Sequence, residues 1–276
     1  MANAATNEAK TQDYGQVAPG VVRKVFLAAA IGLLLWGFKA FGAWAGLLIL
    51  HLFGLKIAFS LADMGLTAAG MCGFLGGWMI YESKLGKLRR RERLLNRIDW
   101  DGNEQVLDVG CGRGLMLVGA AKRLSTGKAT GIDIWQEADL SHNRAEAALE
   151  NARREGVANR VELKTADMRR MPFQDESFDV VVSRAAIHNL YKADERGQAV
   201  REIARVLKPG GKVLIDDIRH HEEYRTILSQ RDCVEIRRLD APLFSWFLAI
   251  LSMGSLQPAA LLARKEPVAR SGISSS

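Results

Sequence analysis

Three glycines at alternate positions dominate the stretch Val106–Leu115. Gly110, Gly112 and Gly114 follow a short apolar run, and an apolar, helix-like pattern then resumes. This order predicts a strand, a tight turn and a helix. Glycine permits positive φ and a close approach of a ligand to the backbone, and a helix start offers unpaired N–H groups. The stretch therefore predicts a loop for a nucleotide-like cofactor, although glycine turns also occur where nothing binds.

The spacing of the glycines narrows the choice of cofactor. The dinucleotide fingerprint G-x-G-x-x-G requires a glycine at the position of Leu115, which this chain lacks. A nicotinamide oxidoreductase is therefore disfavoured.

Acidic residues end the first three predicted strands of this region. Asp108 precedes the glycines, Asp133 ends the next strand, and Asp167 follows the third together with Met168. Ligands of open parallel sheets bind at the carboxyl ends of the strands, where an acid can hold ribose hydroxyls. One such acid is more often a turn former or a helix cap. Three in consecutive units favour a binding site.

The region around these acids alternates apolar runs with helical stretches, which predicts a parallel sheet with helices on both faces. A turn at Lys208–Gly211 is expected between the last of these helices and the fifth strand. The predicted strands are 104–109, 129–134, 160–164, 178–183 and 211–215, and the predicted helices are 115–124, 141–156 and 195–206.

One histidine follows the fourth predicted strand. His188 lies just past the end of this strand, where a general base would have to stand. The alternative is a histidine at a helix start that bonds to the backbone. Asp216 and Asp217 end the fifth strand and are second candidates for the base.

These features together resemble the class I S-adenosylmethionine-dependent methyltransferases, and most closely the small-molecule branch with the ubiquinone and menaquinone methyltransferases. The resemblance covers about residues 105–217. It implies a Rossmann-like, doubly wound α/β sheet of seven strands with the last strand antiparallel, for which 233–239 and 259–264 are the remaining candidates.

The resemblance also implies roles for individual residues. The three glycines would line the methionine and ribose part of S-adenosylmethionine, and Asp133 would hold the ribose diol. Asp167 and Met168 would flank the adenine, and Ser183 and Arg184 would begin the substrate side. The predicted cofactor-binding set is Asp108, Gly110, Gly112, Gly114, Asp133, Trp135, Asp167, Met168 and Ser183, with His188 as the catalytic residue.

A departure from one family motif narrows the class of methyl acceptor, and the cysteines bear on metal binding and disulfides. Methyltransferases that act on planar amino groups carry an (N/D)-P-P-(Y/F) sequence where this chain has Ser183–Ala186, so methylation of DNA bases or glutamine is disfavoured. No nucleic-acid partner is expected. Cys72, Cys111 and Cys233 have neither metal-ligand spacing nor a disulfide pattern, which fits a reducing compartment and no metal site.

An apolar block without proline precedes this region. Residues 25–81 hold only Lys39, Lys56 and Asp63 as charged side chains, and Met64–Tyr81 is uncharged. Runs of about 18 apolar residues indicate membrane-spanning helices. We predict two helices, 25–50 and 57–81, with Lys39 either snorkelling or lying in the hairpin interface. Three shorter helices, or a first helix in the membrane interface, are the alternatives.

Basic residues follow the apolar block. Seven basic and two acidic side chains lie between Glu82 and Arg97, and Arg23 and Lys24 precede the block. This bias predicts that both ends lie on the cytoplasmic side, with the basic stretch near lipid headgroups. A solvated helix face is the alternative.

The chain is thus expected to divide into a flexible N-terminus (1–20), a transmembrane region (21–82), a basic linker helix (83–100), a methyltransferase domain (101–264) and a polar tail (265–276). Residues 242–257 are uncharged. They predict either an insert near the bilayer or plain core.

The leading hypothesis is a methyltransferase anchored in a bacterial-type cell membrane, with a cytoplasmic catalytic domain and a small lipophilic or membrane-associated acceptor. The alternative is a membrane-tethered scaffold that binds the cofactor without turnover.

Overall fold

The computed structural model describes residues 12–15, 19–42, 47–52, 55–136, 143–239 and 257–267 of the chain. It divides into a sheet unit, of residues 1–14, 89–138 and 142–276, and a helical unit, of residues 15–88 and 139–141. Residues 242–256 of the predicted insert and most of both predicted tails lie outside the described residues.

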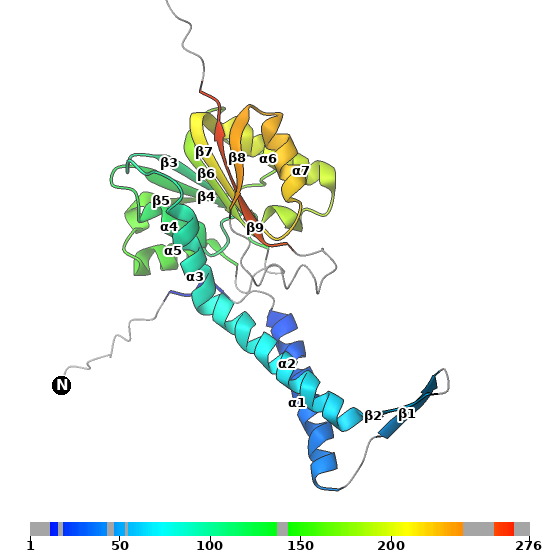
Figure 1. Ribbon diagram of the computed structural model, residues 1–276. Helices are drawn as coiled ribbons and strands as arrows, with labels where there is room; N and C mark the ends of the chain where they lie inside the picture. Colours follow the sequence, from blue (N-terminus) through cyan, green and yellow to red (C-terminus); the bar gives the residue numbers. More distant parts are fainter. Residues whose placement is uncertain are drawn as a thin grey trace, which may run out of the picture. The chain divides into compact units, whose positions relative to one another are not determined.

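A mixed sheet forms the centre of the sheet unit (Figure 1). Its strands are β3 (Gln105–Val109), β4 (Lys128–Asp133), β5 (Val161–Thr165), β6 (Phe178–Arg184), β7 (Leu207–Asp217), β8 (Cys233–Leu239) and β9 (Ala259–Lys265). Their order is β5-β4-β3-β6-β7-β9-β8. β3 to β7 run parallel to one another, and β9 is antiparallel to both β7 and β8. The predicted seven-stranded sheet with an antiparallel last strand is confirmed.

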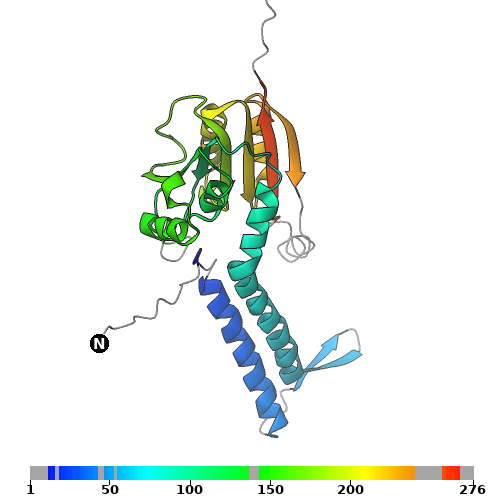
Figure 2. The same cartoon turned by 90° about the vertical axis from the view of Figure 1, so that its left-hand side faces the viewer.

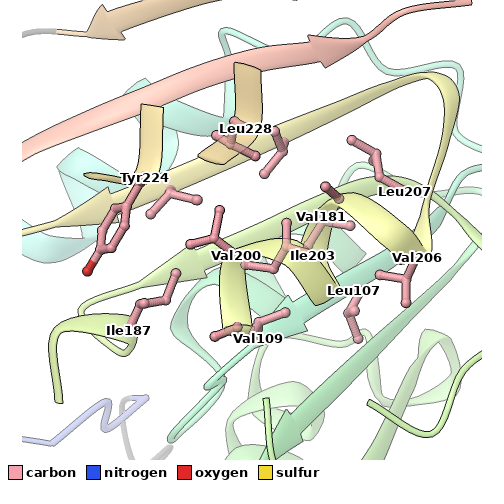
Figure 3. Packing of buried hydrophobic residues seen from close by; sticks show 14 of the residues in the cluster. Leu107, Val109, Val181, Ile187, Val200, Ile203, Val206, Leu207, Tyr224 and Leu228 are labelled. Carbon is pink, nitrogen blue, oxygen red and sulfur yellow. The ribbon is translucent and has the colours of Figure 1, made fainter. Parts of the chain in front are cut away.

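Helices cover both faces of the sheet, because successive side chains of a strand point to opposite faces. The helices are α3 (Lys87–Leu95), α4 (Leu115–Ala121), α5 (Ala145–Arg154), α6 (Ala193–Val206) and α7 (His221–Ser229). Leu107 of β3 belongs to a buried cluster that includes residues of α6 and α7 (Figure 3). Val106, the preceding residue, belongs to the cluster with residues of α3, α4 and α5. The two layers fix the carboxyl ends of the strands at one edge.

The predicted turn at Lys208–Gly211 lies inside a strand. β7 begins at Leu207, which pairs with Phe178, and regular pairing with β6 resumes at Lys212. Proline has no N–H to donate to a sheet ladder, and Gly210 has φ +80°. The sequence signal for a turn therefore marks an irregularity in the strand pairing.

The helical unit contains α1 (Pro19–Ala40), β1 (Leu47–Leu52), β2 (Leu55–Ser60), α2 (Leu61–Tyr81) and the π-helix η1 (Glu82–Gly86). The predicted helices 25–50 and 57–81 were wrong at 47–50 and 57–60, which belong to the antiparallel strands β1 and β2. Gly42 follows the end of α1. It has φ +70°, and its backbone N–H donates a hydrogen bond to the carbonyl oxygen of Lys39. Ser60 begins α2 by accepting the N–H of Asp63. The segment between these two signals is excluded from both helices.

α1 and α2 lie side by side in both views (Figure 2). A Cβ on Gly32 would lie 2.2 Å from the carbonyl oxygen of Gly65, so the two backbones meet where neither has a side chain. Lys39 Nζ forms an ion pair with Asp63 Oδ2 at 2.5 Å and donates to Ser60 Oγ at 3.1 Å. Lys39 therefore lies in the interface between α1 and α2, which is one of the two places predicted for it.

Candidate active site

The glycine loop between β3 and α4 has a backbone that only glycine adopts without strain. φ is +70° at Gly110, +51° at Gly112 and +83° at Gly114. A Cβ on Gly110 would lie 2.3 Å from the Cβ of Ala186 and 3.3 Å from Cε of Met168. The loop is therefore packed tightly against the segments that follow β5 and β6.

We expect Gly110→Ala to lower the free energy of unfolding by about 2–3 kcal/mol, since it adds left-handed strain and a steric overlap. Gly197→Ala is the matched control: it lies inside α6, where the nearest atom to an added Cβ is the flexible end of Arg201 at 3.1 Å. The control should be neutral or slightly stabilising. Urea unfolding of the detergent-solubilised protein measures both, and equal stability of the two variants would contradict the packing described for the loop.

Asp133 links the glycine loop to the end of β4. Its Oδ2 accepts the N–H of Gly112 at 2.8 Å, and its Oδ1 accepts the N–H of Trp135 at 2.7 Å. An ionised carboxylate offers about four lone-pair sites, and the side chain is partly exposed. It can therefore accept further hydrogen bonds from a ligand while it holds the loop.

Asp108 is buried beneath the same loop. Its Oδ2 accepts the N–H of Leu117 at 2.8 Å and so caps the first turn of α4. Its Oδ1 is buried and has no hydrogen-bond partner among the described residues. Burial raises the pKa of Asp108 to about 7. A buried carboxyl oxygen without a donor is costly, and a ligand donor would remove the cost.

The other predicted cofactor residues have protein partners as well. Asp167 is bound by the guanidinium of Arg169, which lowers its pKa, and it remains partly exposed. The indole N–H of Trp135 donates to Thr165 Oγ1 at 2.8 Å. Ser183 is 1% exposed, and its hydroxyl donates to the carbonyl of Val109 at 2.8 Å. Ser183 therefore ties β6 to β3, and its role with the cofactor stays a prediction.

His188 is held by a buried carboxylate at the ends of β6 and β7. Its Nδ1 lies 2.5 Å from Asp217 Oδ1, and its backbone N–H donates to Asp217 Oδ2 at 3.1 Å. The turn that carries it is fixed by Ile187, which is fully buried in the core of Figure 3. Ala185, just before this turn, has φ +50°. This strain fits the sharp exit of the chain from β6.

Asp217 fixes the proton of the His188 ring. A carboxylate can only accept, so Nδ1 carries the proton and Nε2 has a free lone pair. Tyr224 OH donates to Asp217 Oδ2 at 3.2 Å, and the N–H of Ile218 donates to Oδ1 at 2.8 Å. The Asp217 side chain is only 1% exposed. The arrangement can act as a general base at Nε2.

Asp216 has different neighbours from Asp217, although both were candidates for the base. Arg90 binds it through two nitrogens, with Nη2 to Oδ1 at 2.7 Å, and Arg184 Nε lies 3.0 Å from Oδ2. Two guanidinium groups thus occupy both oxygens of Asp216. This side chain joins α3 and β6 to β7, and the dyad of His188 and Asp217 is the better candidate base.

Part of the basic stretch before the sheet is used inside the sheet unit. Arg90 binds Asp216, and Arg91 is 4% exposed and binds Glu155 at 3.0 Å. These ion pairs could not be predicted from the sequence, because Asp216 and Glu155 are distant in sequence from the arginines that bind them. The exposed basic members of the stretch are Lys84, Arg89, Arg93 and Arg97.

The chain is similar in sequence to known methyltransferases. Residues 107–215 match the family model of a methyltransferase domain. The chain is 38% identical over 130 residues to the methyltransferase GfsG of Streptomyces halstedii, covering 47% of this chain and 43% of that protein. It is 34% identical over 140 residues to a phosphatidylethanolamine N-methyltransferase of Cereibacter sphaeroides, covering 50% and 63%. The chain thus spans about half the length of such curated relatives.

The fold also matches solved methyltransferase structures. A phosphoethanolamine N-methyltransferase of Haemonchus contortus superposes with a TM-score of 0.52 at 22% identity, covering 65% of this chain and 52% of that one. A geranyl diphosphate C-methyltransferase of Streptomyces coelicolor gives 0.51 at 18% identity, covering 64% and 78%. At such identities the likeness shows the fold. Together with the family match, it identifies S-adenosylmethionine as the cofactor of this domain.

Proposed function

We propose that this chain, which carries a class I S-adenosylmethionine-dependent methyltransferase domain, transfers a methyl group to a small lipophilic acceptor held in or at a membrane. The observation that carries the proposal is the dyad of His188 and Asp217 at the same edge of the sheet as the glycine loop. That edge is where open α/β sheets bind their ligands.

The residues of the loop fit the cofactor. The orphan Oδ1 of Asp108 can accept a hydrogen bond from the amino group of the methionine part. Asp133 retains lone pairs for the ribose hydroxyls, and the three glycines leave the backbone uncovered by Cβ atoms. Met168, which lies against the loop, supplies an apolar contact for the adenine ring of the cofactor. These roles agree with the set expected from the sequence.

Asp108 should make cofactor affinity depend on pH. With its pKa at about 7, about a tenth of this carboxyl is ionised at pH 6 and about nine tenths at pH 8. Only the carboxylate pairs with the cofactor's ammonium, so we expect Kd to fall about tenfold from pH 6 to pH 8. Isothermal titration measures this, and Asp108→Asn should flatten the profile. A flat profile in the native protein would contradict the role of Asp108.

The raised pKa of Asp108 also affects the stability of the unliganded protein, and there a higher pH is unfavourable. The unfolded chain releases the Asp108 proton near pH 4, whereas the folded chain keeps it up to about pH 7. This carboxyl therefore lowers the stability of the unliganded protein as the pH rises through that window.

The chemistry requires alignment and, for a protonated acceptor, a base. When bound, S-adenosylmethionine supplies a methyl group activated by its sulfonium. His188 Nε2 removes the proton of an acceptor hydroxyl or enol, and Asp217 stabilises the imidazolium that results. Burial of Asp217 strengthens this interaction, because solvent screens it little.

The apolar helices support a membrane location. α1 has 22 residues, about 33 Å at ~1.5 Å per residue, which matches the thickness of a bilayer core. Both α1 and α2 are long and apolar enough to span a membrane by length and composition. Large apolar side chains on them are exposed, with Leu34 at 62% and Phe74 at 68%. Contact with lipid would remove these side chains from water.

The flanking basic residues favour a cytoplasmic catalytic domain, with the two helices crossing a cell membrane of bacterial type. Alkaline carbonate extraction tests the anchor. We expect the native chain to stay in the membrane pellet and a variant with Leu34→Asp and Phe74→Asp to be released. Release of the native chain would refute the membrane location without affecting the assignment of the cofactor.

A further inference from the structure

A short segment before the first apolar helix binds the outside of the glycine loop. Asp13 and Tyr14 belong to the sheet unit, although they precede the helical unit in sequence. Tyr14 is only 5% exposed. Nothing in its sequence context, a polar stretch near the N-terminus, indicates that it would be buried.

Asn151 of α5 links this segment to the loop. The backbone N–H of Asp13 donates to Asn151 Oδ1 at 2.9 Å, and Asn151 Nδ2 donates back to Asp13 O at 2.8 Å. The same Nδ2 donates to the carbonyl of Arg113 at 3.0 Å. Arg113 stands between two of the loop glycines, and its Nη2 forms an ion pair with Asp13 Oδ2 at 2.8 Å. Asn151 is 1% exposed, so these bonds form in a site with little water.

Tyr14 is fixed by a second group of side chains. Its hydroxyl donates to Glu155, and Arg91 Nη1 donates to the same hydroxyl at 3.2 Å. The Arg91 guanidinium also lies over the Tyr14 ring, 5.7 Å from its centroid. Lys122 Nζ forms an ion pair with Glu155 Oε2 at 2.7 Å. The cluster joins α3 and the residues that follow α4 and α5 to the N-terminal segment.

We propose that Asp13 and Tyr14 form a strap that holds the glycine loop in its cofactor-binding conformation, with Asn151 as the link. They act as positioning residues, because none of them is placed against the cofactor. All three glycines of the loop have positive φ, and flexible residues lose much conformational freedom on ordering. A loop that is ordered in advance binds its ligand more tightly.

The strap brings together two parts of the sheet unit that lie far apart in the sequence. Tyr14 precedes α1 by only a few residues, and Arg91 belongs to α3, which follows η1. The Arg91 guanidinium lies over the Tyr14 ring. Cofactor affinity should consequently depend on residues that precede the apolar helices, outside the matched domain.

The test compares variants of the full chain in detergent. We expect Asn151→Ala to raise Kd for S-adenosylmethionine about tenfold, which corresponds to ~1.4 kcal/mol, and Tyr14→Ala to raise it severalfold. Glu150→Ala is the matched control, because this neighbour on α5 pairs only with exposed arginines of the same helix among the described contacts. Its Kd should equal that of the native protein. At saturating cofactor, kcat should stay within about twofold in all three variants.

Two further measurements separate a positioning role from a loss of folding. Hydrogen exchange should quicken at the amides of 110–114 in Tyr14→Ala while the amides of β3 keep their protection. If Asn151→Ala does not fold, Asp13→Ala decides, since its side chain is 64% exposed and lies outside the helices and strands. Native Kd and native loop exchange in the strap variants would overturn the proposal. It rests on the proposed function, and failure of the native protein to bind S-adenosylmethionine would refute that function instead.

Discussion

His188→Ala is expected to lower kcat by about 10²–10⁴-fold, the usual contribution of a general base, and to leave Kd for the cofactor unchanged. The reason is the dyad: Nδ1 is committed to Asp217 at 2.5 Å, which leaves Nε2 to take a proton. His220→Asn is the matched control, because this histidine follows Asp217 by three positions in the sequence and has φ +63°, which asparagine tolerates. The control should retain its activity.

Asp217→Asn tests the same dyad by changing its buried carboxylate. The amide would donate to Nδ1, so the ring proton would move to Nε2 and the base would be lost. We expect kcat to fall by about 10²-fold or more, with little change in the binding of cofactor. Turnover by both variants at the native rate would mean that the acceptor arrives deprotonated, and the role given to the dyad would be wrong.

Asp133→Ala is expected to abolish measurable binding of S-adenosylmethionine. The substitution removes a ribose acceptor, and it also releases the N–H groups of Gly112 and Trp135, which the carboxylate accepts at 2.8 and 2.7 Å. Two hydrogen bonds to a charged group contribute roughly 1.5–3 kcal/mol each, so a loss of at least 100-fold in affinity follows.

Asp99→Ala is the control for this loss, since the Asp99 side chain is 99% exposed and pairs with Lys212. Isothermal titration compares the two variants, and carbonate extraction checks that both stay in the membrane. If Asp133→Ala bound the cofactor as tightly as the control, the assignment of the second strand of the site would be wrong.

The sheet could be predicted well because its signals are local. The central strands β3, β4 and β6 are short apolar runs, and Gly110, Gly112 and Gly114 mark a loop with left-handed backbone. The acids Asp108 and Asp133 stand at strand ends, where parallel order alone brings them to one edge. The β-hairpin at 47–60 was missed because a uniformly apolar run has no period that separates a strand from a membrane helix.

The contacts that complete the site could not be predicted, because their partners are distant in sequence. Asp216 and Asp217 are adjacent and chemically identical, yet one meets two arginines and the other meets His188. Adjacent residues of a strand point to opposite faces, so Asp216 meets Arg90 of α3 and Arg184 of β6 while Asp217 meets the turn that carries His188. The strap is a similar case, since the bonds of Asp13 to Asn151 join residues 138 positions apart.

Transfer of label from methyl-labelled S-adenosylmethionine to a membrane lipid extract tests the central claim most directly. Detergent-purified native protein and His188→Ala are incubated with the extract, and the organic phase is separated and counted. The account predicts a labelled lipophilic product with the native protein and a rate at least about 10²-fold lower with the variant. Cofactor binding without any labelled product, in extracts that contain quinones and phospholipids, would contradict a methyltransferase and favour a cofactor-binding scaffold.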